Sequence, residues 1–214
     1  MNLKEENSRK ISKWTDFYPP LNIEQHLYNL SRHRFLLGKI IELKPRRILE
    51  VGAGSGSLSI FLSTLGLTVV CADNNVKVLE TAKNNCQQFN GNVIFVSADG
   101  FSKLPFDDDF DISFSQGVAE HFTDEQISLF INNQLQISKT VMLSLPNSSY
   151  CQSFGDERLL TIRQWADILS GFNIKEISNY GIEVPGRSYL KHKLLRLKLI
   201  DIIRPHHIYI EIGR

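Results

Sequence analysis

Glycines and acidic residues follow short apolar runs, where they could bind a ligand. The first run leads into Glu50-Val51-Gly52-Ala53-Gly54-Ser55-Gly56 and then into a helical stretch. Glycines let a backbone turn sharply and approach a ligand closely, and the start of a helix favours negative charge. Asp73 and Asp99 end the second and third apolar runs. A carboxylate there can accept hydrogen bonds from two neighbouring hydroxyl groups.

The elements that must position these residues alternate between strand and helix. The expected strands cover 47–51, 68–73, 93–97, 110–115, 140–145, 173–178 and 208–212. The expected helices cover 57–65, 75–88, 123–135 and 161–170, the last capped by Gly171, after a helical stretch over 22–43. This alternation predicts an α/β fold with a doubly wound, mostly parallel seven-stranded sheet that is covered on both faces.

Two interpretations of the glycine-rich turn have to be compared, each with a different cofactor site. A dinucleotide fingerprint requires Gly-x-Gly-x-x-Gly. Counting from Gly52 the sixth residue is Ser57, and counting from Gly54 it is Ser59, so the third glycine is missing in both registers.

The observed spacing resembles motif I of the class I S-adenosylmethionine-dependent methyltransferases. Four later segments resemble that family as well, over roughly residues 32–180: Ser97-Ala98-Asp99-Gly100-Phe101, Pro105–Ile112, Ser115–Phe122 and Val141–Pro146. The resemblance implies a Rossmann-like methyltransferase fold with S-adenosyl-L-methionine as cofactor. It also implies methyl transfer to an O or N atom of a small-molecule acceptor.

The same resemblance implies a role for each motif. The glycines leave space for the methionine part of the cofactor, and Glu50 faces its amino end. Asp73 binds the ribose, Asp99 accepts from the adenine amino group, and Arg34 is a candidate partner for the carboxylate. The expected cofactor residues are Arg34, Glu50, Gly52, Ala53, Gly54, Gly56, Asp73, Asn74, Asp99, Gly100, Phe101, Gln116 and Gly117.

On the acceptor side, methyl transfer requires alignment and exclusion of water, and a base only if the acceptor must lose a proton. His121 follows the fourth strand near the expected methyl position and is the candidate catalytic base. The alternative is that it only shapes the helix start and the cofactor pocket. Trp14, Tyr18 and Asn147 are expected to bind substrate with His121, the two aromatics either forming a lid or simply packing.

The net charge of +1 hides three blocks of opposite sign. Residues 1–47 carry ten Lys/Arg and five Asp/Glu, residues 48–186 carry seven and sixteen, and residues 187–214 carry seven and two. The stretch 181–207 predicts a basic amphipathic helix before the last strand. It could meet an anionic acceptor, bind a membrane surface or a partner, or pack with a solvated basic face. We expect an acceptor that carries negative charge.

Length and composition set the remaining expectations. The 214 residues suit one domain, with an N-terminal helical segment (1–44), a cofactor-binding core (45–180), the basic insert (181–207) and the last strand (208–214). Three irregularly spaced cysteines favour reduced thiols in a cytoplasmic protein and no metal site. No apolar run is long enough to span a membrane. The stretch Ser115–Val118 lacks the Asn/Asp-Pro-Pro-aromatic motif of nucleic-acid amino methylation, which disfavours a nucleic-acid target.

Two alternative functions remain open at this point. An NAD(P)-dependent oxidoreductase is disfavoured by Ser57 and Ser59 and by the lack of a Tyr-x-x-x-Lys pair. A non-enzymatic partner or regulatory protein with the same fold would bind the cofactor without methylating an acceptor.

Overall fold

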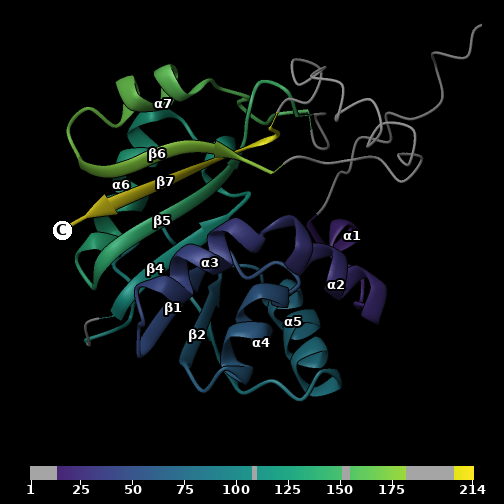
Figure 1. Ribbon diagram of the computed structural model, residues 1–214. Coiled ribbons are helices and arrows are strands. Elements are labelled where there is room, and N and C mark those ends of the chain that lie inside the picture. The colour runs from purple at the N-terminus through teal and green to yellow at the C-terminus, as the bar shows by residue number, and fades with distance from the viewer. Residues whose placement is uncertain (1–13, 108–109, 151–154, 182–204) are drawn as a thin grey trace, which may run out of the picture.

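A seven-stranded sheet forms the centre of the computed structural model, which describes residues 14–107, 110–150, 155–181 and 205–214 (Figure 1). The strands lie in the order β3-β2-β1-β4-β5-β7-β6. They are β1 (Arg47–Val51), β2 (Thr68–Asp73), β3 (Val93–Ser97), β4 (Phe110–Gln116), β5 (Ser138–Pro146), β6 (Asn173–Tyr180) and β7 (His207–Gly213). All neighbours pair in parallel except β7, which is antiparallel to β5 and β6. The expected doubly wound, mostly parallel sheet is therefore confirmed.

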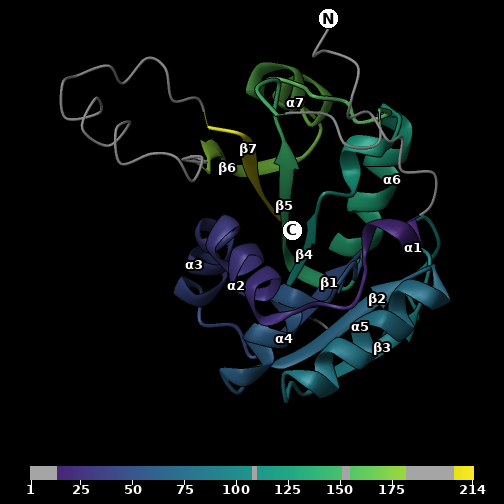
Figure 2. The same cartoon turned by 90° about the vertical axis from the view of Figure 1, so that its right-hand side faces the viewer.

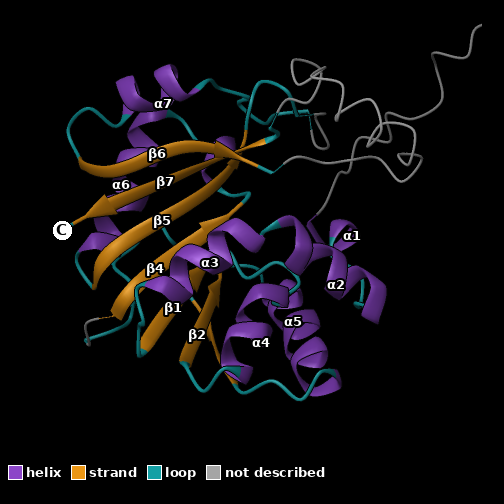
Figure 3. Cartoon of the chain, in the orientation of Figure 1, coloured by secondary structure: helices purple, strands orange, loops and turns teal. Residues whose placement is uncertain are grey.

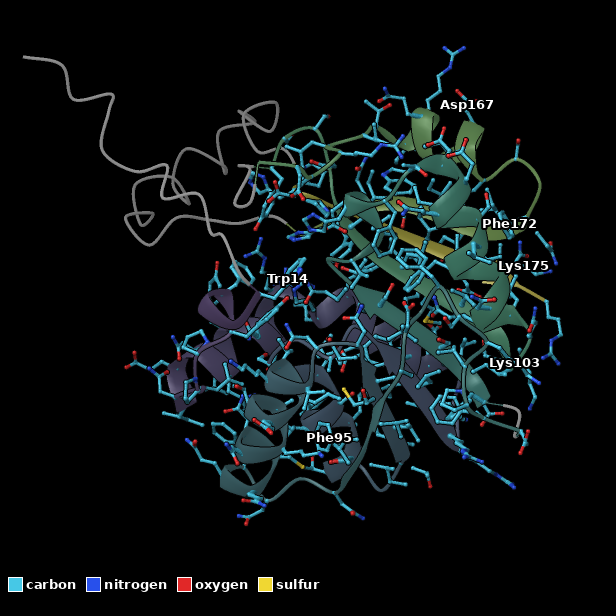
Figure 4. All side chains as sticks on the ribbon, turned by 180° about the vertical axis from the view of Figure 1, so that it is seen from behind. Trp14, Phe95, Lys103, Asp167, Phe172 and Lys175 are labelled. Atoms are coloured by element: carbon cyan, nitrogen blue, oxygen red, sulfur yellow. The ribbon has the colours of Figure 1, made fainter. Side chains whose placement is uncertain are left out.

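Helices cover both faces of this sheet (Figure 3). They are α1 (Trp14–Phe17), α2 (Ile23–Arg32), α3 (Arg34–Glu42), α4 (Ser57–Thr64), α5 (Val76–Gln88), α6 (Asp124–Leu135) and α7 (Ile162–Ile168). A 3-10 turn, Ala119–His121, follows β4. The strands β3 and β6, which carry Phe95 and Lys175, form the two edges of the sheet, far apart in Figure 4.

The alternation of side chains along each strand divides the core between the two faces. Ile48 and Val69 pack with Leu36 of α3 and Leu62 of α4. Their neighbours Leu49 and Val70 point the other way, into the core that α6 and α7 share; its largest fully buried side chain is Trp165. Because strands with helices on both faces bury both sets of residues, they are apolar almost throughout.

The N-terminal segment crosses the edge of the sheet where the parallel strands end. Figure 2 shows it running from α1 to α2 in front of β1 and β2. It is attached to α5: the Leu21 amide donates to Asn85 Oδ1 over 3.0 Å, and Gln88 Nε2 donates to the Leu21 carbonyl over 3.1 Å. Asn85 Nδ2 also donates to the Ser55 carbonyl over 2.9 Å. One side chain thus joins this segment to the glycine-rich turn.

The structure corrects two expectations about helices. The stretch 22–43 forms two helices, because His33 leaves the helical conformation and ends α2 while it precedes α3. The ring of His33 is buried and bonds to the Tyr180 hydroxyl, so a tertiary contact accompanies the break. Gly171 does not cap α7, which ends at Ile168 with Leu169 as its C-cap. The predicted basic helix falls almost wholly on 182–204, outside the described residues.

The described part of the chain was also compared with the expectations about membrane spans, cysteines and metal sites. No helix there is both long and apolar enough to cross a bilayer. Cys71 and Cys86 are free and buried, while Cys151 lies outside the described residues. Within the same residues, no three His, Cys, Asp or Glu side chains are grouped so that they could hold a metal ion.

Candidate functional site

The turn between β1 and α4 passes close to two neighbouring side chains. Gly52 and Gly54 have φ angles of 88° and 50°, which L side chains rarely adopt. A Cβ on Gly52 would lie 2.5 Å from Val118 Cγ2, and one on Gly54 would lie 2.9 Å from the ring of Tyr18. Glycine is therefore required at both positions by conformation and by space.

Acidic side chains stand beside this turn at the ends of β2 and β3. Asp73 Oδ1 accepts from the amide of Asn75 over 2.8 Å, and Asn75 in turn caps α5. Burial raises the pKa of Asp73, partly offset by backbone amides that donate to it. Asp99 Oδ1 accepts from the amide of Phe101 over 3.1 Å. Both carboxylates are thus fixed by local backbone donors and line the same cavity.

Two cavities flank the glycine-rich turn and share the walls formed by Trp14, Tyr18, Gly52, Gly54, Gly117 and His121. The first, cavity A, has a volume of about 270 Å³, and the second, cavity B, about 150 Å³. Small-molecule sites usually measure roughly 300–1,000 Å³, so the two together reach that range. Cavity B contains the acids of β2 and β3 with the apolar side chains of Val51, Val118, Phe101 and Phe122.

Cavity A contains buried carboxyl groups and a buried phenol. Glu50 is 4% exposed; Ser59 Oγ donates to it over 2.5 Å and Cys71 Sγ over 3.6 Å. Burial raises the pKa of Glu50 to about 7 and, together with nearby Glu157 and Asp156, raises that of Glu120 to about 8. Burial also raises the pKa of Tyr18, with Glu120 as the largest charge contribution. These shifts arise because a dry site penalises the charged form of an acid.

His121 lies between an exposed and a buried carboxyl group. Its Nδ1 is 2.9 Å from Oδ1 of Asp156, whose side chain is 70% exposed, and its Nε2 is 4.0 Å from Oε1 of Glu120. The ring of Trp14 meets the His121 ring edge-on, with centroids 5.1 Å apart. Trp14 and Tyr18 are stacked, with centroids 6.2 Å apart, so the N-terminal segment adds an aromatic wall.

The opposite wall of cavity A is basic and aromatic. Arg32 Nε donates to His207 Nε2 over 3.3 Å, and the guanidinium lies 5.0 Å from the centroid of the Tyr150 ring. His207 stacks on Tyr180, whose hydroxyl bonds to His33 and Ser144. Burial lowers the pKa of His33 to about 3 and that of His207 to about 2, and Arg32 adds to both shifts.

Three predicted site residues lie elsewhere than expected. Arg34 is exposed at the start of α3 and lines neither cavity, whereas Arg32 lines cavity A. Gly56 also lines neither cavity; a Cβ there would meet Ala82 Cβ at 3.2 Å, so this glycine brings α4 close to α5. Asn147 uses its amide to bind Asn179 and the Pro205 carbonyl, and its Oδ1 accepts from the Ser149 amide.

The remaining predicted residues line one or both cavities. They are Trp14, Tyr18, Glu50, Gly52, Ala53, Gly54, Asp73, Asn74, Asp99, Gly100, Phe101, Gln116, Gly117 and His121. Five further residues line cavity A that were not predicted from the sequence: Arg32, His33, Tyr150, Glu157 and His207. No local spacing signals them, because they come from separated segments that only the tertiary structure brings together, as in the contacts of Arg32 with His207 and with Tyr150.

The geometry matches what a nucleoside-bearing cofactor needs: acids at successive strand ends, a tight glycine turn and apolar walls. Residues 48–140 match a family model described as a methyltransferase domain. The matched stretch contains the glycine-rich turn, Asp73 and Asp99. No curated protein matches this chain significantly.

Solved structures share the fold of this chain. Magnesium protoporphyrin IX methyltransferase from Synechocystis PCC 6803, solved with bound SAH, is 17% identical with a TM-score of 0.62, over 92% of this chain and 89% of that one. PH0226 protein from Pyrococcus horikoshii OT3 is 13% identical with a TM-score of 0.66, over 92% and 94%. The methyltransferase domain of bacterial CtHen1 is 15% identical with a TM-score of 0.64, over 87% and 99%. Nothing in these comparisons supports the nicotinamide alternative.

The residues that line the two cavities fit S-adenosylmethionine, the cofactor expected from the sequence. The carboxylates of Asp73 and Asp99 are acceptors suited to hydroxyl and amino donors. Because Gly52 and Gly54 have no Cβ, they leave space beside the turn that any side chain would occupy. The carboxyl groups in cavity A suit a ligand that carries positive charge on sulfur and nitrogen.

Proposed function

We propose that this protein is an S-adenosylmethionine-dependent methyltransferase, and that it transfers the methyl group to an O or N atom of a small-molecule acceptor that carries negative charge. The observation that supports this proposal is the composition of cavity A. Its Glu120 and His121 wall faces the glycine-rich turn, and its Arg32 wall offers a cation for an anionic group. Arg32 can meet a carboxylate or phosphate with several N–H donors, and its guanidinium is always charged.

For the cofactor, we propose the contacts that cavity B and the glycine-rich turn can provide. Asp73, with Asn74, accepts from the ribose hydroxyls, while Asp99, Gly100 and Phe101 surround the adenine. On the other side of the turn, Glu50 and the backbone near Gln116 and Gly117 face the methionine part. Arg34 is left out of this set because it is exposed outside both cavities.

At the acceptor end, the bound cofactor supplies an electrophilic methyl group whose sulfur is already a good leaving group. The protein must therefore align the acceptor and exclude water. We propose that Trp14 and Tyr18 cover the acceptor site, because they form an aromatic wall against His121 and the glycine-rich turn. In this proposal, His121 belongs to the acceptor side of the site, where the acceptor loses its proton.

The decisive experiment supplies the protein with labelled S-adenosylmethionine and an extract of cellular small molecules, separated by anion exchange. We expect label in an ultrafiltered product that the anion-exchange column retains. The Asp73→Asn variant serves as the cofactor-binding control. Label found only in RNA, in protein or in unretained cationic products would contradict the proposal.

The proposed location is the cytoplasm. The two described cysteines are buried free thiols, which are typical of reducing compartments. Fractionation of the source cells, with an antibody against the chain, tests this part separately.

A further inference from the structure

Glu120 is a buried acid whose second carboxyl oxygen has no partner. The residue is 3% exposed, and Oε2 has no hydrogen-bond partner among the described residues. A buried polar atom left without a hydrogen bond costs about 1–3 kcal/mol, so such atoms often have a functional reason. The side chain lines cavity A, and its Oε1 lies 3.4 Å from where a Cβ on Gly117 would be. The carboxyl group therefore faces the cavity under the turn that follows β4.

The surroundings of Glu120 make it a better proton acceptor than a permanent anion. The titratable groups around it are Tyr18 from the N-terminal segment, His121 from its own turn, and Asp156 and Glu157 from the loop after β5. Among these described groups, His121 is the one with a basic side chain. Burial and the two nearby acids raise the pKa of Glu120 to about 8, and a general base works best with a pKa near the working pH.

Arg158 in the same loop does not neutralise this carboxyl group. Its guanidinium donates to the Phe122 carbonyl over 2.7 Å and to Asp124 over 2.6 Å. Only its backbone amide contacts Glu120, donating to the main-chain carbonyl over 2.8 Å.

The ring of His121 is held by a hydrogen bond to Asp156 and not to Glu120. Its Nδ1 is bonded to Asp156 on the solvent side, which leaves Nε2 at 4.0 Å from Glu120 Oε1. The imidazole thus stands between the buried carboxyl group and an exposed one. Oε2 of Glu120 has no hydrogen-bond partner among the described residues, and the Glu120 side chain lines cavity A.

We propose that Glu120 is the catalytic base that takes the acceptor's proton, and that His121 is the positioning residue beside it. This inference rests on the proposed function, because it requires an acceptor atom that bears a proton. The lone pair of the O or N atom forms the bond to the methyl carbon. The carbon–sulfur bond breaks with its electron pair left on sulfur, which becomes a neutral thioether. The proton of the acceptor atom passes to Oε2 of Glu120.

The test needs no knowledge of the acceptor. Sinefungin is a cofactor analogue that carries an amine-bearing carbon in place of the methylated sulfur, and S-adenosylhomocysteine lacks the methyl group. If Glu120 faces the methyl position, its carboxylate pairs with that ammonium group. By calorimetry at pH 8.5, we expect sinefungin to bind the wild-type protein about 10-fold more tightly than S-adenosylhomocysteine, the equivalent of one charge-assisted hydrogen bond. In Glu120→Gln the ratio should fall to near one, while the affinity for S-adenosylhomocysteine stays within about 3-fold.

Controls separate this idea from the proposed function. Glu80→Gln, at an exposed position of α5, should keep the wild-type ratio. If Glu120→Gln does not fold, the wild-type protein alone still tests the inference. Its affinity for sinefungin relative to S-adenosylhomocysteine should grow from pH 6 to 8.5 as Glu120 loses its proton. A ratio near one in the wild type, a ratio that Glu120→Gln leaves unchanged, or a preference independent of pH overturns the inference. Because only cofactor analogues are used, failure to find an anionic small-molecule acceptor would leave this result unaffected.

Discussion

The carboxyl groups around the two cavities have different surroundings, and these surroundings determine which role each group is suited to. Asp73 and Asp99 are each fixed by a backbone amide at the end of a strand and remain available to a ligand's donors. Glu50 and Glu120 are buried, so their protonated forms are favoured near neutral pH. The first pair is suited to hydrogen bonding with a cofactor, and the second responds to positive charge that enters cavity A.

Replacing Asp73 by Asn tests the role of the strand-end acid. Asn keeps the size of the side chain but removes the charge and one acceptor, so it cannot accept from both ribose hydroxyls as a carboxylate does. A ligand present at 100 times its Kd stabilises a protein by about 2.7 kcal/mol. We expect S-adenosylhomocysteine to raise the Tm of the wild type and to leave that of Asp73→Asn nearly unchanged. An equal rise in both proteins would remove Asp73 from its assigned role.

At the scale of elements, the site depends on a short N-terminal segment that α5 holds at Leu21 through Asn85 and Gln88. The segment from α1 to α2 places Tyr18 over Gly54, although α1 itself has only four residues. Its attachment is Asn85 in α5, which bonds both to Leu21 and to the glycine-rich turn at Ser55. The segment and the turn therefore share one anchor.

Replacing Asn85 by Ala should loosen this segment more than the fold. The change leaves the Leu21 amide and the Ser55 carbonyl without their partner, which costs about 1–3 kcal/mol for a buried group. We expect amide hydrogen exchange of residues 14–22 to accelerate and the affinity for S-adenosylhomocysteine to weaken, with only a moderate loss of Tm. Thr81→Ala, at a partly exposed position of the same helix, is the matched control. Unchanged exchange in residues 14–22 would show that Asn85 does not hold the segment.

At the scale of the whole molecule, the buried histidines and the buried acids have opposite effects on how the free energy of unfolding changes with pH. Together they set the pH of greatest stability. His33 and His207 are buried with pKa values lowered to about 3 and about 2, so the unfolded chain binds more protons below about pH 6.5 and stability falls there. Glu50 and Glu120 have raised pKa values, about 7 and about 8, so the folded chain holds more protons than the unfolded one above about pH 5. Their contribution declines as pH rises until both are ionised.

The cofactor-free protein should therefore lose stability between about pH 6.5 and 8.5, because the loss from the two acids exceeds the gain that remains as the histidines of the unfolded chain finish losing their protons. We expect the free energy of unfolding, measured by urea denaturation, to fall by on the order of 1–3 kcal/mol across this range. Glu120→Gln should flatten the decline and be the more stable protein at pH 8.5, because no buried charge forms. A profile that is flat in the wild type, or equally steep in the variant, would contradict the assigned environments of these acids.

The sequence by itself determined the sheet and the order of its elements along the chain, and it predicted most of the residues that line cavity B. Strands that are buried on both faces are apolar almost throughout, and the residues from Glu50 to Gly56, Asp73 and Asp99 lie at or just after strand ends, so local patterns locate them. Only the tertiary structure decided which residues form the basic and aromatic part of cavity A. Arg32, the last residue of α2, meets Tyr150 after β5 and His207 at the start of β7, whereas Arg34, two residues later, is exposed and lines neither cavity. The unpartnered oxygen of Glu120 likewise depends on burial, which residue spacing does not encode.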